Sequence, residues 1–272
     1  MPPLRGLVDA GFEVPLVVSG ADRRRGRGSA LSPSPVKAAA LDLGLAVTDR
    51  VDDVIGVGAD LGVVVAYGRL VRPHVLAALP MVNLHFSLLP RWRGAAPVER
   101  AILAGDDETG VCLMQLEEGL DTGPVFACER VAIGPEETLD ELRARLVAGG
   151  TDLLLRSLRE GLGEAWPQQG EVTYASKIDP AELRLDWARP AVELHRVVRL
   201  GRAWTTFRGT RLRVLRAVVV DGDGAPGELA GTVVGTGGGG LELVEVQPEG
   251  RRPMPASAWL AGARPAPGER LA

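Results

Sequence analysis

The sequence has few of the residues on which small metal-binding or disulfide-stabilised folds depend. Its 272 residues include only two cysteines, Cys112 and Cys128, and three histidines. The cysteines show no CxxC spacing and no histidine cluster lies near them, so the sequence indicates neither a zinc site nor a disulfide framework. We therefore expect two buried, reduced thiols and no metal ion.

Long apolar runs are absent as well. No run reaches the roughly 20 residues that a membrane-spanning helix needs. The first residues, MPPLRGLVDAG, also lack the apolar core of a secretory signal peptide. These observations predict a cytoplasmic protein that does not act at a membrane.

Lysine is nearly absent, since Lys37 and Lys177 are the only two, and the formal net charge is -4. This balance excludes a protein that coats nucleic acid over its whole surface, although a local basic patch remains compatible with it. Apolar residues make up 46% and charged residues 24%, which predicts a folded globular chain. The length favours one larger and one smaller domain.

The first half of the chain alternates short apolar runs with segments of helical spacing, a pattern typical of a parallel sheet covered by helices. The strands are expected at 12–19, 61–67, 81–86 and 109–117, and the first helices at 34–45 and 94–105. Residues 136–162 then follow a period of about 3.6, which predicts one long helix or two helices that break at Gly149 and Gly150.

The second half changes character after residue 164. Residues 165–190 mix polar, proline and glycine residues and are expected to form a surface linker. A helix-like stretch at 191–204 is followed by short alternating segments at 205–209, 210–220, 227–248 and 252–262, separated by glycines. This pattern predicts a small β-barrel of the OB type at 191–272, behind an α/β domain at 1–164.

Two polar residues stand at the end of the apolar run MVNLHF. In a strand, residues i and i+2 point to the same face, so Asn83 and His85 would project side by side. They would lie at the carboxyl end of the strand, where open α/β sheets bind ligands. An amide and an imidazole on one face suit acyl or formyl transfer, but alone the spacing is more often that of a structural pair.

A carboxylate follows another expected strand. Asp121 lies in the glycine-flanked stretch GLDTGPVF, where it could orient His85 or take the proton that leaves an attacking amine. Seen in isolation, an aspartate in such a stretch is more often a plain turn residue.

Taken together, these motifs resemble a known superfamily. Residues 83–123, from NLHFSLLPRWRGAAP to LEEGLDTG, closely resemble the catalytic region of the 10-formyltetrahydrofolate-dependent formyltransferases, and in particular the family that formylates methionyl-tRNA. Residues 26–40, 63–71 and 172–199 look like further segments of that family. The resemblance implies a Rossmann-like formyltransferase domain followed by an OB-like tRNA-binding domain.

The resemblance also implies roles for individual residues. Asn83, His85 and Asp121 match the catalytic positions, and Ser87, Leu88, Leu89 and Pro90 match the segment that lines the folate site. The implied reaction transfers the formyl group of 10-formyltetrahydrofolate to the α-amino group of methionyl initiator tRNA. It requires no metal ion and no DNA, and we expect the enzyme to be a monomer.

The basic stretch DRRRGRG lies where the family has a loop that reaches the tRNA. The tRNA-binding residues implied by this position are Arg23, Arg24, Arg25 and Arg27, with Lys37 a further candidate. Arginines of this kind can meet phosphates, although the composition alone would suggest a solvated charge run. His74 and His195 are interpreted as structural.

The start of the sequence departs from the family pattern. Relatives open with a β-strand and a Gly-Thr-Pro turn, whereas this sequence begins inside the helix that would follow. We expect the absence of that strand to leave backbone groups unpaired. Our hypothesis is that translation starts upstream of Met1; a longer native product on N-terminal sequencing would support it.

Two kinds of alternative share these motifs. One is another formyltransferase, either a sugar-nucleotide N-formyltransferase or a glycinamide ribonucleotide transformylase; the latter normally ends near the long helix. The other is a tRNA- or folate-binding homologue with impaired catalysis. RWRGAAP and the arginine stretch favour the tRNA enzyme, and intact Asn83, His85 and Asp121 favour catalysis.

Overall fold

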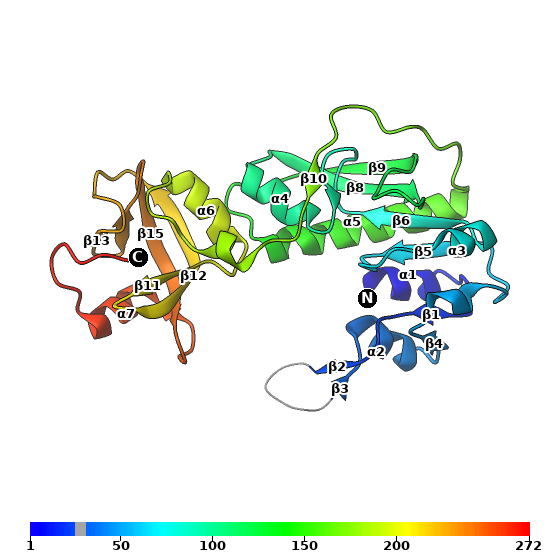
Figure 1. Cartoon of the computed structure of the whole chain (residues 1–272), viewed down its shortest axis with the longest axis horizontal. Coiled ribbons are helices and arrows are strands. Elements are labelled where there is room, and N and C mark those ends of the chain that lie inside the picture. Colours follow the sequence, from blue (N-terminus) through cyan, green and yellow to red (C-terminus); the bar gives the residue numbers. More distant parts are fainter. Residues whose placement is uncertain (25–30) are drawn as a thin grey trace. The chain divides into compact units, whose positions relative to one another are not determined.

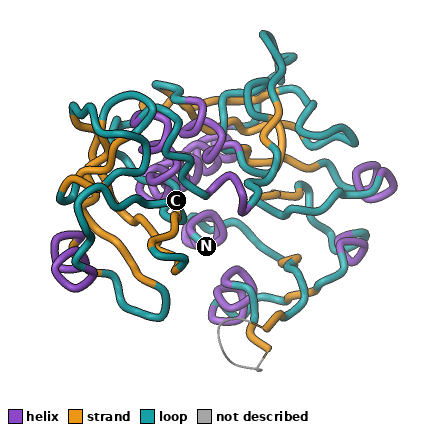
Figure 2. Tube along the Cα trace, turned by 60° about the vertical axis from the view of Figure 1, so that its left-hand side comes forward, coloured by secondary structure: helices purple, strands orange, loops and turns teal. Residues whose placement is uncertain are grey.

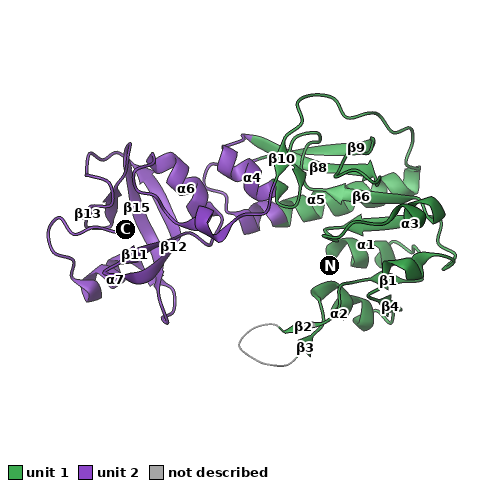
Figure 3. Ribbon diagram, viewed as in Figure 1, with its two compact units in different colours: residues 1–97, 108–132, 144–175 green, residues 98–107, 133–143, 176–272 purple. Residues whose placement is uncertain are grey.

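The structure of the chain is a computed structural model that describes residues 1–24 and 31–272 (Figure 1). Its helices, strands and loops can be followed along the trace in Figure 2. The chain divides into two compact units (Figure 3). Unit 1 comprises residues 1–97, 108–132 and 144–175, and unit 2 comprises residues 98–107, 133–143 and 176–272.

Unit 1 is an α/β structure with its strands in several small sheets. β5, β6, β8 and β9 form a four-stranded sheet in that order. β5 and β6 are parallel, whereas β8 and β9 run antiparallel to their neighbours. Two-stranded sheets pair β1 with β4, β2 with β3 and β7 with β10. The strands are β1 (Val17–Val18), β2 (Arg23–Arg24), β3 (Leu31–Ser32), β4 (Val47–Thr48), β5 (Gly62–Val65), β6 (Met81–His85), β7 (Arg93–Gly94), β8 (Glu108–Gln115), β9 (Val125–Ala132) and β10 (Tyr174–Ala175).

The helices of unit 1 begin where the sequence provides starting signals. In α2, the Ser34 hydroxyl accepts a hydrogen bond from the backbone N–H of Lys37, and Pro35 occupies the first turn. The helices of this part of the chain are α1 (Pro2–Asp9), α2 (Pro35–Asp42), the 3-10 turn η1 (Val51–Val54) and α3 (Pro73–Ala78). The predicted helix at 34–45 is thus present, slightly shorter than expected.

The long helix α5 (Leu139–Glu160) is continuous through its two glycines. A Cβ atom at Gly150 would lie 3.0 Å from the Val111 side chain of β8, so glycine allows the helix to approach the sheet closely. In Figure 1, α5 runs along the sheet that contains β6 and β8. Of the two alternatives at this position, the single helix is therefore correct.

Unit 2 is built around an antiparallel sheet. Its strand order is β11-β12-β15-β14-β13, and β16 pairs with β15. The strands are β11 (Trp204–Phe207), β12 (Thr210–Val220), β13 (Leu229–Ala230), β14 (Val233–Gly235), β15 (Gly240–Pro248) and β16 (Met254–Pro255). The helical elements are α4 (Pro97–Ala104), the 3-10 turn η2 (Pro180–Leu183), α6 (Ala191–Arg199) and α7 (Ala256–Ala263). A core of aliphatic residues with Trp187, Phe207 and Trp259 lies within this unit.

Two expectations from the sequence were wrong. Residues 252–262 were expected to be a strand, but only Met254 and Pro255 pair with β15 before the chain turns into α7. Cys112 and Cys128 were expected to be buried, reduced thiols, but they form a disulfide, and Cys128 is exposed. The two cysteines lie directly opposite each other on β8 and β9, and this register brings their Cα atoms within 4.2 Å.

Among the residues that the structure describes, no helix is both long enough and apolar enough to cross a membrane.

Candidate active site

Strand β6 presents the first two residues of the site. Asn83 lies opposite Met114 of β8, and His85 lies opposite Cys112, so both pairs occupy the same face of the sheet. Both side chains are buried, with 8% of Asn83 and 5% of His85 exposed. No other residue in the described part of the chain hydrogen-bonds the Asn83 side chain. A buried amide of this kind is available to a ligand.

The imidazole of His85 is oriented by backbone. Its Nε2 lies 2.9 Å from the carbonyl oxygen of Trp92. Because a carbonyl oxygen can only accept, Nε2 carries the proton in this contact. Trp92 itself has a φ of 64°, an uncommon conformation for a residue with a side chain. The other ring nitrogen, Nδ1, is thus the atom that can exchange a proton.

Asp121 faces that second nitrogen. Its Oδ2 lies 3.6 Å from His85 Nδ1, a separation that allows charge interaction but is too long for a direct hydrogen bond. The same oxygen accepts a hydrogen bond of 2.8 Å from the backbone N–H of Gly94. The Asp121 backbone lies in the left-handed region, with a φ of 50°. The predicted trio of Asn83, His85 and Asp121 is therefore brought together at one end of the sheet.

The segment implied to contact folate forms a tight loop after β6. Ser87 is fully buried, and its hydroxyl donates to the Arg91 carbonyl at 2.6 Å. Leu88 lies against Gly110 of β8, and Leu89 packs on the cluster around Cys112. The Leu89–Pro90 peptide bond is cis. Leu88 and Leu89 are partly exposed beside the trio, whereas the polar group of Ser87 serves the loop itself.

The basic residues implied to contact tRNA are only partly described. Arg25 and Arg27 lie outside the described residues. Arg23 and Arg24 form β2, which pairs with Leu31 and Ser32, and the Arg24 side chain is exposed. Lys37 is engaged within the chain, because its Nζ lies 2.8 Å from Asp22 Oδ1.

The other two histidines lie apart from the trio in the sequence and in their contacts. His74 pairs with Asp52 on the surface. His195, in α6 of unit 2, is buried and lies 3.0 Å from Glu136 Oε2. Burial lowers the pKa of His195, Arg199 lowers it further, and Glu136 opposes both effects. This carboxylate partner was not predicted, because Glu136 and His195 lie 59 positions apart in the sequence.

Two backbone groups in the site were not foreseen. The Trp92 carbonyl and the Gly94 N–H hold His85 and Asp121, yet neither depends on a recognisable side chain. The sequence motif that contains both residues, RWRGAAP, indicated the family but not these backbone contacts. In the described part of the chain, no three histidine, cysteine or acidic side chains gather into a metal-binding group.

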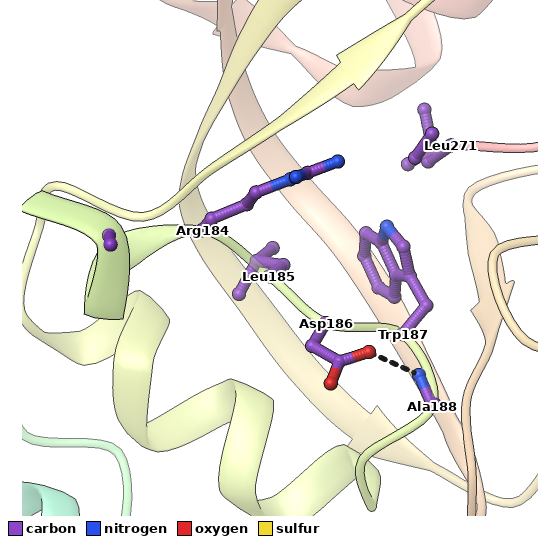
Figure 4. A pocket seen from close by; sticks show the side chains of 8 residues that line it. Arg184, Leu185, Asp186, Trp187, Ala188 and Leu271 are labelled. Carbon is purple, nitrogen blue, oxygen red and sulfur yellow. Dashed lines mark hydrogen bonds between the residues drawn. The ribbon is translucent and has the colours of Figure 1, made fainter.

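A separate hollow of about 520 Å³ belongs to unit 2 (Figure 4). Arg184, Leu185, Trp187 and Leu271 line it, together with Asp186, whose carboxylate accepts a 3.1 Å hydrogen bond from the Ala188 N–H. It contains none of the catalytic candidates.

The fold and the site define a class of protein. A buried amide, a backbone-oriented imidazole and a carboxylate at the end of a sheet are groups that suit the transfer of an acyl or formyl unit. Residues 7–158 match the family model described as formyl transferase, and residues 177–264 match that of the formyl transferase C-terminal domain. The chain is a formyltransferase by both criteria.

Similarity to curated relatives indicates which formyltransferase family the chain belongs to. The chain is 45% identical to a methionyl-tRNA formyltransferase of Cereibacter sphaeroides, across 96% of this chain and 92% of the relative. It is 46% identical to the enzyme of that name from Paracoccus denitrificans, across 96% and 93%. The chain belongs to the methionyl-tRNA formyltransferase family.

Solved structures share the fold at low identity. An N-formyltransferase from Helicobacter canadensis, in complex with folinic acid and dTDP-3-aminofucose, matches with a TM-score of 0.68 and 16% identity, over 89% of this chain and 93% of that one. HypX from Aquifex aeolicus in complex with tetrahydrofolic acid matches with a TM-score of 0.62 and 18% identity, over 84% and 44%. The predicted fold class, an α/β formyltransferase domain followed by a β domain, is confirmed.

Proposed function

We propose that this chain transfers the formyl group of 10-formyltetrahydrofolate to the α-amino group of methionyl initiator tRNA, and that Asn83, His85 and Asp121 carry the chemistry. The observation behind the proposal is the convergence of the three polar side chains, in a chain of this family, with His85 Nδ1 facing Asp121 at 3.6 Å. 10-Formyltetrahydrofolate supplies the formyl carbon when it is bound.

Bond formation requires that the attacking amine lose a proton. The amine nitrogen bonds to the formyl carbon, and the bond from that carbon to the folate nitrogen breaks. We assign the departing proton to the Asp121 carboxylate, which is 13% exposed and keeps one oxygen on the Gly94 N–H. Asp121 passes this proton to the folate nitrogen as that nitrogen leaves, so charge and atoms balance.

Negative charge develops on the formyl oxygen as the amine attacks. The Asn83 amide supplies an N–H that no other described residue uses, and His85 supplies a second donor when Nδ1 also carries a proton. Donors fixed before the reaction stabilise such charge without reorganisation, and removal of one typically costs about 10²- to 10³-fold in rate. This division leaves Nε2 bound to the Trp92 carbonyl throughout.

The residues next to the trio suit a folate. Leu88 and Leu89 are partly exposed apolar residues directly after β6, and a flat aromatic ring packs favourably on such a surface. Pro90 follows Leu89 through a cis peptide bond and ends the segment that we assign to the folate site. We assign Ser87 to this site through the loop it stabilises, because its hydroxyl is bonded to the Arg91 carbonyl.

We assign RNA binding to the basic stretch DRRRGRG and to residues 191–272. We propose that Arg23, Arg24, Arg25, Arg27 and Lys37 meet phosphates, and Lys37 must exchange its Asp22 partner to do so. Residues 1–164 would supply the chemistry, 191–272 an RNA-binding domain, and 165–190 their connection. We place the reaction in the cytoplasm, carried out by a monomer without a resident metal ion.

The test is formyl transfer by the purified chain from 10-formyltetrahydrofolate to methionyl initiator tRNA. A dTDP-amino sugar serves as the competing acceptor, and His85→Ala serves as the control for trace activity from the host. We expect transfer to tRNA that the variant loses. Transfer to the sugar alone would move the assignment to a sugar enzyme, and the absence of both would contradict a catalytic role.

A further inference from the structure

Residues 166–175, here called the strap, contact both the loop that follows β6 and the turn that contains Asp121. The Trp166 N–H donates to the carbonyl of Val125, at the start of β9, at 2.9 Å, and the Trp166 carbonyl accepts from the Val125 N–H at 2.8 Å. At the other end, Tyr174 and Ala175 pair as β10 with Arg93 and Gly94 of β7. The expected linker is therefore integral to unit 1 over this stretch.

Between these ends, the strap reaches the partners of His85. The Thr173 hydroxyl accepts a hydrogen bond of 2.8 Å from the backbone N–H of Trp92. The Thr173 carbonyl accepts a hydrogen bond of 2.9 Å from the Arg93 N–H. The Trp92 carbonyl accepts the hydrogen bond from His85 Nε2. Thr173 therefore fixes the two peptide units that flank Trp92, the residue that orients the imidazole.

Gln168 makes the corresponding contacts with the Asp121 turn. Its Nε2 donates to the carbonyl oxygens of Asp121 and Gly123, both at 2.8 Å. Its Oε1 accepts two hydrogen bonds from the Arg93 guanidinium, at 3.0 Å from Nε and 2.6 Å from one terminal nitrogen. The amide orientation is unambiguous, because carbonyls only accept and a guanidinium only donates.

Gln168 contacts the Asp121 turn from outside it. The Asp121 backbone lies in the left-handed region, with a φ of 50°, which aspartate adopts more readily than most residues with a Cβ. Gln168 bonds the carbonyl of that residue and the carbonyl two residues later. The carboxylate of Asp121 consequently has a defined place opposite His85.

We propose that Gln168 is a positioning residue for formyl transfer: it joins the Asp121 turn to Arg93 and thereby sets the separation of the Asp121 carboxylate from His85. This inference rests on the proposed function, because the separation matters only if the two groups share a reaction. Gln168 acts through the backbone of Asp121 and touches neither substrate.

The sharpest variant is Gln168→Glu, which keeps the size and shape of the side chain. The carboxylate still accepts from Arg93, but it has no donor for the two carbonyls of the turn. Gln169→Glu is the matched control, since Gln169 is exposed and its side chain has no hydrogen bond or ion pair within the described part of the chain. Both variants add the same charge at neighbouring positions.

We expect kcat to fall about 10- to 100-fold in Gln168→Glu, the size of effect that a misplacement of about 1 Å can cause. KM for each substrate should stay within about threefold of wild type, because neither substrate is contacted. Gln169→Glu should match wild type in both parameters. Equal kcat in the two variants would overturn the inference.

A second readout does not depend on turnover. The chain has three histidines, so the ring signals of His85 can be assigned by NMR and compared with those of His74 and His195. Gln168→Glu should move the His85 signals and leave the other two in place. Unmoved His85 signals would overturn the positioning role, whereas a wild-type chain inactive on tRNA would instead contradict the proposed function.

If Gln168→Glu does not fold, Thr173→Val tests the strap from its other end. Valine keeps the branched shape but removes the oxygen that accepts from Trp92 N–H. A folded Thr173→Val variant with lowered kcat and moved His85 signals supports the strap as a positioning element. Wild-type kcat and unmoved signals in that variant would contradict it.

Discussion

At the scale of single residues, the site combines the Asn83 amide, which no described residue hydrogen-bonds, with two side chains, His85 and Asp121, that each hydrogen-bond a backbone group. Asn83 is buried and unused by the described residues, whereas His85 and Asp121 each have one atom on a backbone group. The backbone contacts leave His85 Nδ1 facing the Asp121 carboxylate. The three residues should therefore respond differently to substitution.

Asn83→Ala separates catalysis from stability. Because no hydrogen bond to a described residue is lost, the free energy of unfolding should change by no more than about 1 kcal/mol. The rate of formyl transfer should fall about 10²- to 10³-fold, as when one oxyanion donor is removed. Single-turnover kinetics and urea unfolding check the two values, and a large loss of stability with little loss of rate would show a structural role.

Asp121→Asn isolates the charge of the carboxylate. Asparagine tolerates the left-handed backbone and can still accept from the Gly94 N–H, so the fold should be kept. We expect kcat to fall about 10²- to 10⁴-fold because the proton acceptor is lost. Steady-state kinetics give the result, with circular dichroism as the control, and a variant as active as wild type would remove Asp121 from the chemistry.

At the scale of elements, the sequence pattern located the main strands and helices but not every partner. The runs around β5, β6 and β8 and the long period of α5 were recognisable because burial imposes their spacing. β9 has only one buried residue, Val125, and its later positions alternate between half-buried and exposed. α7 follows two prolines, and neither element was predicted. Asn83, His85 and Asp121 were found through a motif; Gln168 and the Trp92 carbonyl depend on tertiary contacts that no local pattern contains.

The β8–β9 pair predicts a measurable effect of reduction. The disulfide joins residues 16 positions apart, and in the chain-entropy description a loop of that size stabilises the fold by about 3 kcal/mol. Urea unfolding with and without a reducing agent should differ by up to this amount. A Cys112→Ser, Cys128→Ser double variant should be insensitive to the reagent; an identical unfolding midpoint for reduced and oxidised wild type would contradict the prediction.

At the scale of the whole molecule, unit 2 contains a histidine that makes stability depend on pH. The folded-state pKa of His195 lies below its ordinary value of 6.5, chiefly because of burial. The unfolded chain therefore binds more protons than the folded chain once the pH falls below about 6.5. The stability that the neutral ring provides is complete above that pH and is lost as the pH falls towards the folded-state pKa.

His195→Gln should flatten this dependence. The free energy of unfolding of wild type should fall by up to about 1.4 kcal/mol per pH unit below pH 6.5 from this one group. The variant should show a smaller slope between pH 6.5 and 5. Equal slopes for His195→Gln and wild type would contradict the assignment.

The position of the strap affects where a chimera between this chain and a relative can have its crossover. The two family models match residues 7–158 and 177–264, so the strap at 166–175 falls between them. A chimera with its crossover at 158 would combine this chain's catalytic loops with a foreign strap, whereas a crossover after 176 would keep Gln168 and Thr173 with their native partners. The best crossover point for a chimera between this chain and a relative therefore lies after the strap.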